Sequence, residues 1–167
     1  ATIRSYYEIL EDCLVAERID PIVSSNTRKK LTKSCRYLLF DLGVRRLAAG
    51  EGMAVTPTRS GELFEQFVGL QLVRLARLQS QRMRIRFWRD SDGPEVDFVI
   101  EASSDLTPIE VKWNESPSKS DARHLEVFLD EYSPQGKGWI VCRSARSFKV
   151  SDRVTAIPWQ DLANSLF

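Results

Sequence analysis

The strongest constraint on the fold is a pair of short runs, "EVDFVIE" at residues 95–101 and "PIEVKW" at residues 108–113. Both runs alternate between apolar and polar residues, which predicts β-strands. The polar segment "SSDLTP" between them predicts a turn. Side chains alternate across a strand, so Val96, Phe98 and Ile100 are expected to share one face. The sequence therefore predicts an antiparallel strand pair with one apolar face.

The rest of the chain predicts further elements around this pair. Ser60 can cap a long helix that reaches about Gln79, and "MRIRFW" at residues 83–88 alternates like a strand. A second helix is expected within residues 117–132, followed by a short apolar strand at residues 139–143. The three consecutive strands can form a meander, and the strand after the second helix must run parallel to a neighbour. This order predicts an α/β fold with a mixed sheet and a helix on each side.

The N-terminal part has a different organisation. Residues 2–16 have amphipathic helical spacing, and the strand-like runs at 18–23 and 35–41 are joined by a polar, basic segment. A helix followed by a two-stranded ribbon resembles the last helix and wing of a winged-helix unit; the alternative is a plain α/β appendage. We therefore predict a partial winged-helix-like segment at residues 1–52 and a separate domain at residues 58–167.

Three charged residues interrupt the strand pair. If the apolar sets of the two strands coincide, Asp97, Glu110 and Lys112 emerge together on the opposite face. Neighbouring carboxylates repel, and a divalent cation such as Mg²⁺, which prefers oxygen ligands, would neutralise them. Together with a lysine, this residue set suits metal-assisted attack of water on a phosphodiester. The alternative is the solvated face of an ordinary hairpin.

Glu65 is a fourth candidate, on the long helix. It lies among apolar neighbours, and Gly69 four residues later would allow a strand to approach the helix closely. Glu62, one turn earlier, competes for the same role. The alternative for both is an exposed glutamate near a helix N-terminus, where the helix dipole favours negative charge.

Composition excludes several classes of protein. The formal net charge is +1, which argues against a strongly electrostatic, non-specific DNA binder. Three scattered cysteines without CxxC spacing and a single histidine argue against a structural zinc site and indicate reduced thiols in a cytoplasmic protein. There is no signal peptide and no apolar run of the roughly 18 residues that a membrane-spanning helix needs. Because the chain begins with Ala1, we expect it to be part of a longer protein.

Two stretches are locally basic. Residues 28–36 carry five cationic side chains and residues 74–89 carry six arginines. The simpler interpretation of both is a solvated face. If the chain binds nucleic acid, Arg28, Lys29 and Lys30 in the basic turn are candidate phosphate contacts. Arg89 is a further candidate, next to Trp88, which could stack on a base but is better explained by packing.

The order of elements and charged residues resembles that of the PD-(D/E)XK nuclease superfamily. The resemblance implies a restriction-endonuclease-like αβββαβ core with a mixed sheet, extended here by an N-terminal helix and β-ribbon. It assigns Mg²⁺ or Mn²⁺ binding to Asp97, Glu110 and Glu65, and assistance to the attacking water to Lys112. Val96 precedes Asp97, so the proline–aspartate pair of the family name is absent, as in other divergent members.

A second resemblance covers nearly the whole chain. The segments "YYEILEDCLVAERIDP", "GELFEQFVGLQL", "FWRDSDGPEVDFVIE" and "PIEVKW" are similar to the C-terminal half of prokaryotic AAA-type ATPases, a domain of unknown function. No GxxxxGK[ST] motif occurs in this sequence, so ATP binding cannot be assigned to it. The resemblance implies an ATPase module of the parent chain as a partner, leaves oligomeric assembly open, and gives a non-catalytic regulatory module as the alternative to a DNA nuclease.

Overall fold

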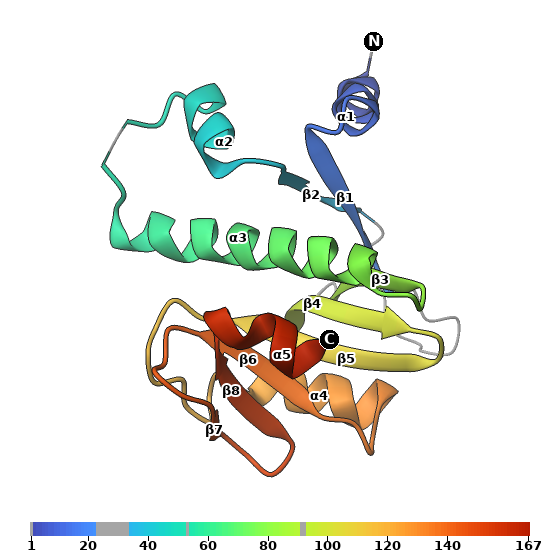
Figure 1. The fold of residues 1–167 in the computed structure, drawn as a ribbon, viewed down its shortest axis with the longest axis vertical. Coiled ribbons are helices and arrows are strands. Elements are labelled where there is room, and N and C mark those ends of the chain that lie inside the picture. The colour runs from blue at the N-terminus through green and yellow to red at the C-terminus, as the bar shows by residue number, and fades with distance from the viewer. Residues whose placement is uncertain (1, 23–33, 53, 91–92) are drawn as a thin grey trace.

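The computed structural model describes residues 2–22, 34–52, 54–90 and 93–167, and has an α/β architecture (Figure 1). The helices are α1 (Ile3–Asp12), α2 (Leu42–Ala48), α3 (Pro57–Leu78), α4 (Arg123–Tyr132) and α5 (Leu162–Leu166), with a 3₁₀ turn at Trp159–Asp161. The strands are β1 (Ala16–Pro21), β2 (Arg36–Leu39), β3 (Met83–Arg89), β4 (Glu95–Ala102), β5 (Asp105–Val111), β6 (Gly138–Cys142), β7 (Phe148–Lys149) and β8 (Val154–Pro158). Within the described ranges, these strands form one eight-stranded sheet in the order β2-β1-β3-β4-β5-β6-β8-β7.

The central strands follow the predicted topology. Strands β3, β4 and β5 pair antiparallel as a meander, and β6 runs parallel to β5 after the crossover through α4. The sheet is therefore mixed, as the sequence predicts. Strand β8 lies between β6 and β7 and runs parallel to β6.

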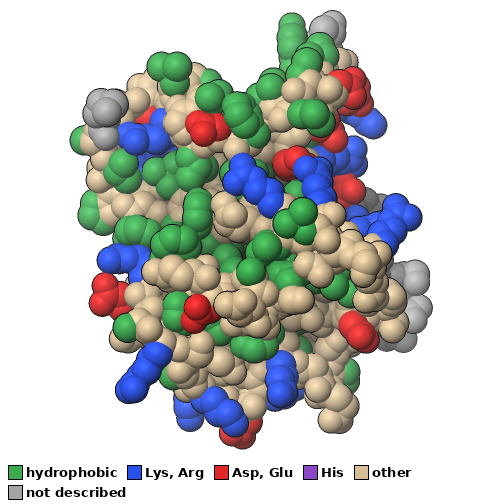
Figure 2. Space-filling view, in the orientation of Figure 1, with side chains coloured by type: hydrophobic (Ala, Val, Ile, Leu, Met, Phe, Trp, Pro, Cys, Tyr) green, Lys and Arg blue, Asp and Glu red, His purple; other side chains and the backbone are tan. Residues whose placement is uncertain are grey.

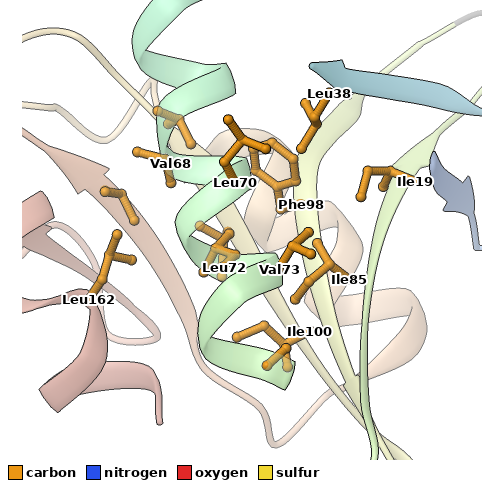
Figure 3. Close-up of a cluster of buried hydrophobic side chains, with 14 of the residues drawn as sticks. Ile19, Leu38, Val68, Leu70, Leu72, Val73, Ile85, Phe98, Ile100 and Leu162 are labelled. Atoms are coloured by element: carbon orange, nitrogen blue, oxygen red, sulfur yellow. The ribbon is translucent and has the colours of Figure 1, made fainter. Parts of the chain in front are cut away.

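Helices cover both faces of the sheet and bury two apolar clusters. Figure 1 shows α3 and α4 on opposite sides of the strands. Val68 and Leu72 of α3 pack with Ile100 of β4 in one cluster, seen in Figure 3. Leu125 and Phe128 of α4 belong to the other cluster. This two-sided burial explains why the central strands are apolar at most positions on both faces.

The long helix begins earlier than the sequence predicts. Its N-cap is Thr56, whose hydroxyl accepts a hydrogen bond from the backbone N–H of Arg59. Pro57 occupies the first helical position, where its missing N–H costs nothing and its fixed φ suits the helix. The expected cap, Ser60, lies inside the helix instead, so the helix gains almost one turn over the prediction.

A glycine sets how closely α3 approaches the sheet. A Cβ on Gly69 would lie 2.5 Å from the ring of Phe98 and 2.8 Å from Leu38. Only a residue without a side chain allows Phe98 of β4 to enter this contact. The close approach expected at this glycine is confirmed, and it holds the N-terminal half of α3 against β4.

An irregularity in β4 changes which face its residues occupy. The register between β3 and β4 shifts between Arg86 and Trp88, so that Asp97 and Phe98 together lie opposite Phe87. Such a bulge breaks the alternation of side chains along the strand. The sequence predicted one shared face for Val96, Phe98 and Ile100; instead Phe98 and Ile100 pack on the α3 side, and Val96 joins the cluster on the α4 side.

The N-terminal ribbon is attached to the sheet. β1 pairs with β3 in parallel at Asp20–Arg86 and Pro21–Phe87, and β2 pairs with β1 at the edge. The division into a winged-helix-like segment and a separate domain stays a prediction. Figure 2 shows apolar side chains on the surface of this N-terminal part. Ile3 and Ile9 of α1 and Leu47 of α2 are exposed apolar residues of this part.

Two further expectations concern reduced cysteines and the lack of a membrane-spanning helix. The three cysteines are free, and Cys142 is buried whereas Cys13 is exposed. No helix among the described residues is long and apolar enough to cross a membrane.

Candidate functional site

Asp97 lies at the bulge of β4, where the strand separates from β5. The paired register between these two strands ends at Phe98 and Ile109. Beyond that point the backbone N–H of Val111 donates a 2.8 Å hydrogen bond to Oδ2 of Asp97. The carboxylate thus takes the place of a backbone partner, and its side chain is held in one orientation while only 8% exposed.

Glu110 and Lys112 lie at the end of β5, next to this bulge. Lys112 Nζ is 2.7 Å from Glu110 Oε1, in a charge-assisted hydrogen bond. Glu110 is 5% exposed, and its second oxygen, Oε2, is buried without a hydrogen-bond partner among the described residues. An unpaired buried carboxylate oxygen is costly when it is ionised.

The electrostatics of these residues are strongly coupled. Burial and the negative charge of Asp97 raise the pKa of Glu110 to about 8. Burial also raises the pKa of Asp97, although the N–H of Val111 and the charge of Lys112 oppose this. Burial alone would lower the pKa of Lys112, but the attraction of Glu110 outweighs it and the pKa is raised. Burial and mutual repulsion therefore favour the protonated forms of these acids.

Glu65 of α3 is the third acid of this region. Burial and the charge of Asp97 raise the pKa of Glu65 to about 7, against the attraction of Arg36. Its side chain is still 40% exposed, so it is the most accessible of the three acids. The competing candidate, Glu62, forms an ion pair with Arg59 at 2.9 Å and lies on the exposed surface. The geometry thus favours Glu65 over Glu62 as a member of the site.

Arg36 of β2 reaches into the same region from the N-terminal ribbon. Its guanidinium nitrogens lie 3.6 Å from Glu65 and 3.1 Å from Glu95, and one donates to the backbone oxygen of Asp97 at 3.5 Å. The guanidinium also stacks over the ring of Phe87, 4.4 Å from its centroid. Sequence reasoning placed Arg36 in a basic run and a strand-like run, because nothing local reveals that it meets acids about 30 and 60 positions away.

Among the residues considered for nucleic-acid contact, Trp88 and Arg89 lie at the end of β3. Arg89 is exposed and its Nε lies 3.5 Å from Glu95. Trp88 is fully buried against Phe128 of α4, so the packing interpretation is confirmed and the ring is not available for stacking on a base. The basic turn with Arg28, Lys29 and Lys30 lies outside the described residues.

The fit of a divalent cation can be judged from the donor set. The orphaned Oε2 of Glu110 and the raised pKa of each buried acid suit a cation that is bound mainly by Asp97 and Glu110. Among the described residues, however, no group of three or more His, Cys, Asp or Glu is close enough to hold a metal ion. Glu65 is therefore not placed to form a three-carboxylate group with Asp97 and Glu110. Metal binding by all three acids stays a prediction.

Comparisons with known proteins identify the family. Uncharacterized proteins of Mycobacterium bovis and Mycobacterium tuberculosis are each 27% identical over 94% of this chain, which spans about a third (34%) of their length.

Among solved structures, a chain of the Thermococcus gammatolerans assembly of McrB AAA+ hexamers with bound McrC is similar at a TM-score of 0.43. The identity is 19%, over 59% of this chain and 27% of that chain. A family model described as a domain of unknown function, DUF4143, matches residues 60–162, which is more than half of the chain. The chain therefore belongs to the DUF4143 family.

Proposed function

We propose that this chain carries a divalent-metal-dependent nuclease-like domain that acts on DNA. The observation that carries the proposal is the buried pair Asp97 and Glu110, with one carboxylate oxygen unpaired and Lys112 fixed beside it. The resemblance to PD-(D/E)XK nucleases, with a restriction-endonuclease-like core, supports the same assignment. A solvated hairpin face, the alternative for these residues, does not explain why both acids are buried.

Each residue of the site has a separate role in this proposal. Asp97 and Glu110 would hold Mg²⁺ or Mn²⁺, and Glu65 lies close enough to respond to the charge of Asp97. A cation bound there would supply Lewis-acid activation of water and charge neutralisation at the phosphate. The ammonium of Lys112, which Glu110 holds in position, would stabilise negative charge that develops in the transition state. The N–H of Val111 keeps Asp97 in its orientation.

The test is cleavage of supercoiled and branched DNA by the purified chain with Mg²⁺ or Mn²⁺. We expect Lys112→Ala to lower the cleavage rate by about 100-fold or more, because it removes a positioned charge from the site. Lys137→Ala, an exposed lysine in the loop after α4, is the matched control and should cleave at the wild-type rate. Cleavage that Lys112→Ala leaves unchanged would overturn the assignment.

A second candidate is a non-catalytic interaction or regulatory module that has kept the nuclease fold. Arg36 favours it, because its guanidinium already pairs with Glu65 and Glu95 and so supplies internal positive charge beside the site. A dication and this arginine would repel each other. The two candidates differ in one measurable property: a non-catalytic module does not bind Mn²⁺ through Asp97.

We further infer that the chain works as part of a larger AAA-type ATPase. The support is the sequence resemblance to the C-terminal half of such ATPases and the greater length of the mycobacterial relatives. An ATPase module of the parent chain is then the expected partner, and oligomeric assembly would follow that module.

A further inference from the structure

A second charged region lies away from the acidic site, between β1, β3 and the C-terminal end of α3. The strands β1 and β3 pair only at their C-terminal ends, at Asp20–Arg86 and Pro21–Phe87. Towards their N-termini they separate, and a cleft of about 490 Å³ opens between them. A smaller hollow of about 320 Å³ adjoins it and shares Arg82 and Arg84.

Arginines are the most frequent residues in the lining of the larger hollow, which we call the arginine cleft. Five line the larger hollow, and four of them come from the stretch 74–89 that the sequence marks as basic. The five are Arg18, Arg77, Arg82, Arg84 and Arg86. Three acids also line the two hollows: Glu17, Asp20 and Glu101. The cleft therefore carries a net positive charge in a chain whose formal net charge is only +1.

The acids neutralise some of these arginines but not all. Arg77 forms a double hydrogen bond with Glu17 at 2.8 and 2.7 Å, and Arg86 pairs with Glu101 at 3.0 Å. Arg82 and Arg84 are exposed and have no ion-pair or hydrogen-bond partner among the described residues.

Arg18, which lines the cleft from β1, is neutralised within its own strand. Its Nε lies 2.8 Å from Oδ1 of Asp20. Among the described residues, Arg82 and Arg84 are therefore the cleft arginines whose charge is left for an anionic ligand.

The shape and lining of the cleft indicate which anion it fits. Its guanidinium groups extend over two adjoining hollows, and such groups pair well with phosphate oxygens. No aromatic side chain is present among the described residues that line either hollow, so nothing there would stack on a base. Figure 2 shows cationic and acidic side chains together over β1 and the end of α3, on an open surface. These features suit an extended phosphate backbone better than a single nucleotide.

We propose that the arginine cleft binds the phosphate backbone of nucleic acid, independently of base sequence. Arg84 lies opposite Glu101 of β4, four residues from Asp97, so the cleft and the acidic site are about 13 Å apart along the strand. One strand of duplex DNA advances about 3.4 Å per nucleotide, so four nucleotides span this distance. The inference stands on the arginines alone and does not depend on metal binding or cleavage.

The test measures binding of single-stranded and duplex DNA by fluorescence anisotropy, in EDTA so that no metal chemistry contributes. The double variant Arg82→Ala/Arg84→Ala should bind DNA at least about tenfold more weakly. The slope of the logarithm of its affinity against the logarithm of salt concentration should be smaller in magnitude by about 1.5 to 2. Because both side chains are exposed and unpaired, its unfolding midpoint should match that of the wild type.

A charge-matched control comes from the opposite edge of the sheet. Arg146→Ala/Lys149→Ala also removes two exposed cations, around β7, and should leave DNA affinity near the wild-type value. Equal losses in the two double variants would overturn the proposal, since total charge alone would then explain binding.

One further binding measurement distinguishes a nucleic-acid cleft from a small-ligand site. Adenosine monophosphate binding as tight as DNA binding would overturn the nucleic-acid assignment, because the cleft would then be a small-ligand site.

Discussion

At the scale of single residues, Glu110 shows how burial and charge combine. It is 5% exposed, one oxygen pairs with Lys112, and the other has no partner among the described residues. Burial and the negative charge of Asp97 disfavour its ionised form, which raises its pKa to about 8. The protonation of Glu110 therefore makes the stability of the fold depend on pH.

The linkage predicts a pH dependence for the metal-free protein. The pKa of Glu110 is about 8 in the folded state and near its ordinary value when unfolded, so the folded state holds the proton more tightly. Stability should therefore fall as the pH rises from about 5 to 8.5, by about 2–4 kcal/mol. Urea unfolding in EDTA across this range measures the effect.

Two substitutions test whether Glu110 causes this pH dependence. Glu110→Gln cannot lose a proton, so most of the fall in stability should disappear, and the remainder belongs to Asp97 and Glu65, whose pKa values are also raised. Glu62→Gln, an exposed acid on the same helix as Glu65, should keep the wild-type dependence. A wild-type stability that increases with pH over this window would contradict the assigned burial of Glu110.

Only part of the candidate site could be predicted at this scale. Periodicity and the short turn predict that Asp97 lies in one strand and Glu110 in the next, and the structure has both residues in β4 and β5. The face that Asp97 occupies does not follow from alternation, because the bulge lies at this residue. The contribution of Arg36 and its pairing with Glu95 could not be predicted, because both depend on where the N-terminal ribbon joins the sheet.

At the scale of elements, the position of the site depends on how α3 packs against β4. Phe98 follows Asp97 at the bulge, and its ring lies where a side chain on Gly69 would be. Glu65 is four residues before Gly69, one turn along the same helix. The contact that fits α3 to β4 thus also sets the distance between Glu65 and Asp97.

This packing predicts opposite effects for two glycines of α3. Gly69→Ala should destabilise the protein by about 1–3 kcal/mol, because the new methyl group overlaps Phe98 and Leu38 and this exceeds the gain in helix propensity. Gly61→Ala, in open space on the same helix, should stabilise it by about 0.5–1 kcal/mol. Chemical denaturation of the two variants measures both. Stabilisation by Gly69→Ala would contradict the close approach.

The elements themselves were predicted with uneven success, for identifiable reasons. The order of helices and strands from α3 to β6 follows directly from periodicity. The start of α3 was placed too late because Ser60 was chosen as the cap, whereas Thr56 caps the helix and Pro57 begins it. The alternation rule also failed at Val96, because a bulge depends on the pairing partner β3 and leaves no mark in the sequence of β4.

At the scale of the whole molecule, the sheet brings together segments that are distant in the chain. β2 and β1 extend the edge beside β3, so Arg36 from the ribbon reaches Glu65 of α3 and Glu95 of β4. The same extension creates the arginine cleft where β1 and β3 separate. The N-terminal ribbon thus contributes to both charged regions of the molecule.

The central claim is that Asp97 and Glu110 together hold one divalent cation, and calorimetric titration of the intact chain with Mn²⁺ tests it most directly. We expect one ion per chain. At pH 7.5 binding should release protons, because the raised pKa of Glu110 leaves it largely protonated before the ion binds. The measured heat should therefore change with the ionisation enthalpy of the buffer.

Two variants decide the outcome of this titration. Asp97→Asn should weaken Mn²⁺ binding by at least about tenfold, since it removes a charged ligand while keeping the shape of the side chain. Glu62→Gln should bind Mn²⁺ like the wild type, because Glu62 pairs with Arg59 outside the site. Absence of Mn²⁺ binding at millimolar concentrations, or binding that Asp97→Asn leaves unchanged, would contradict the claim.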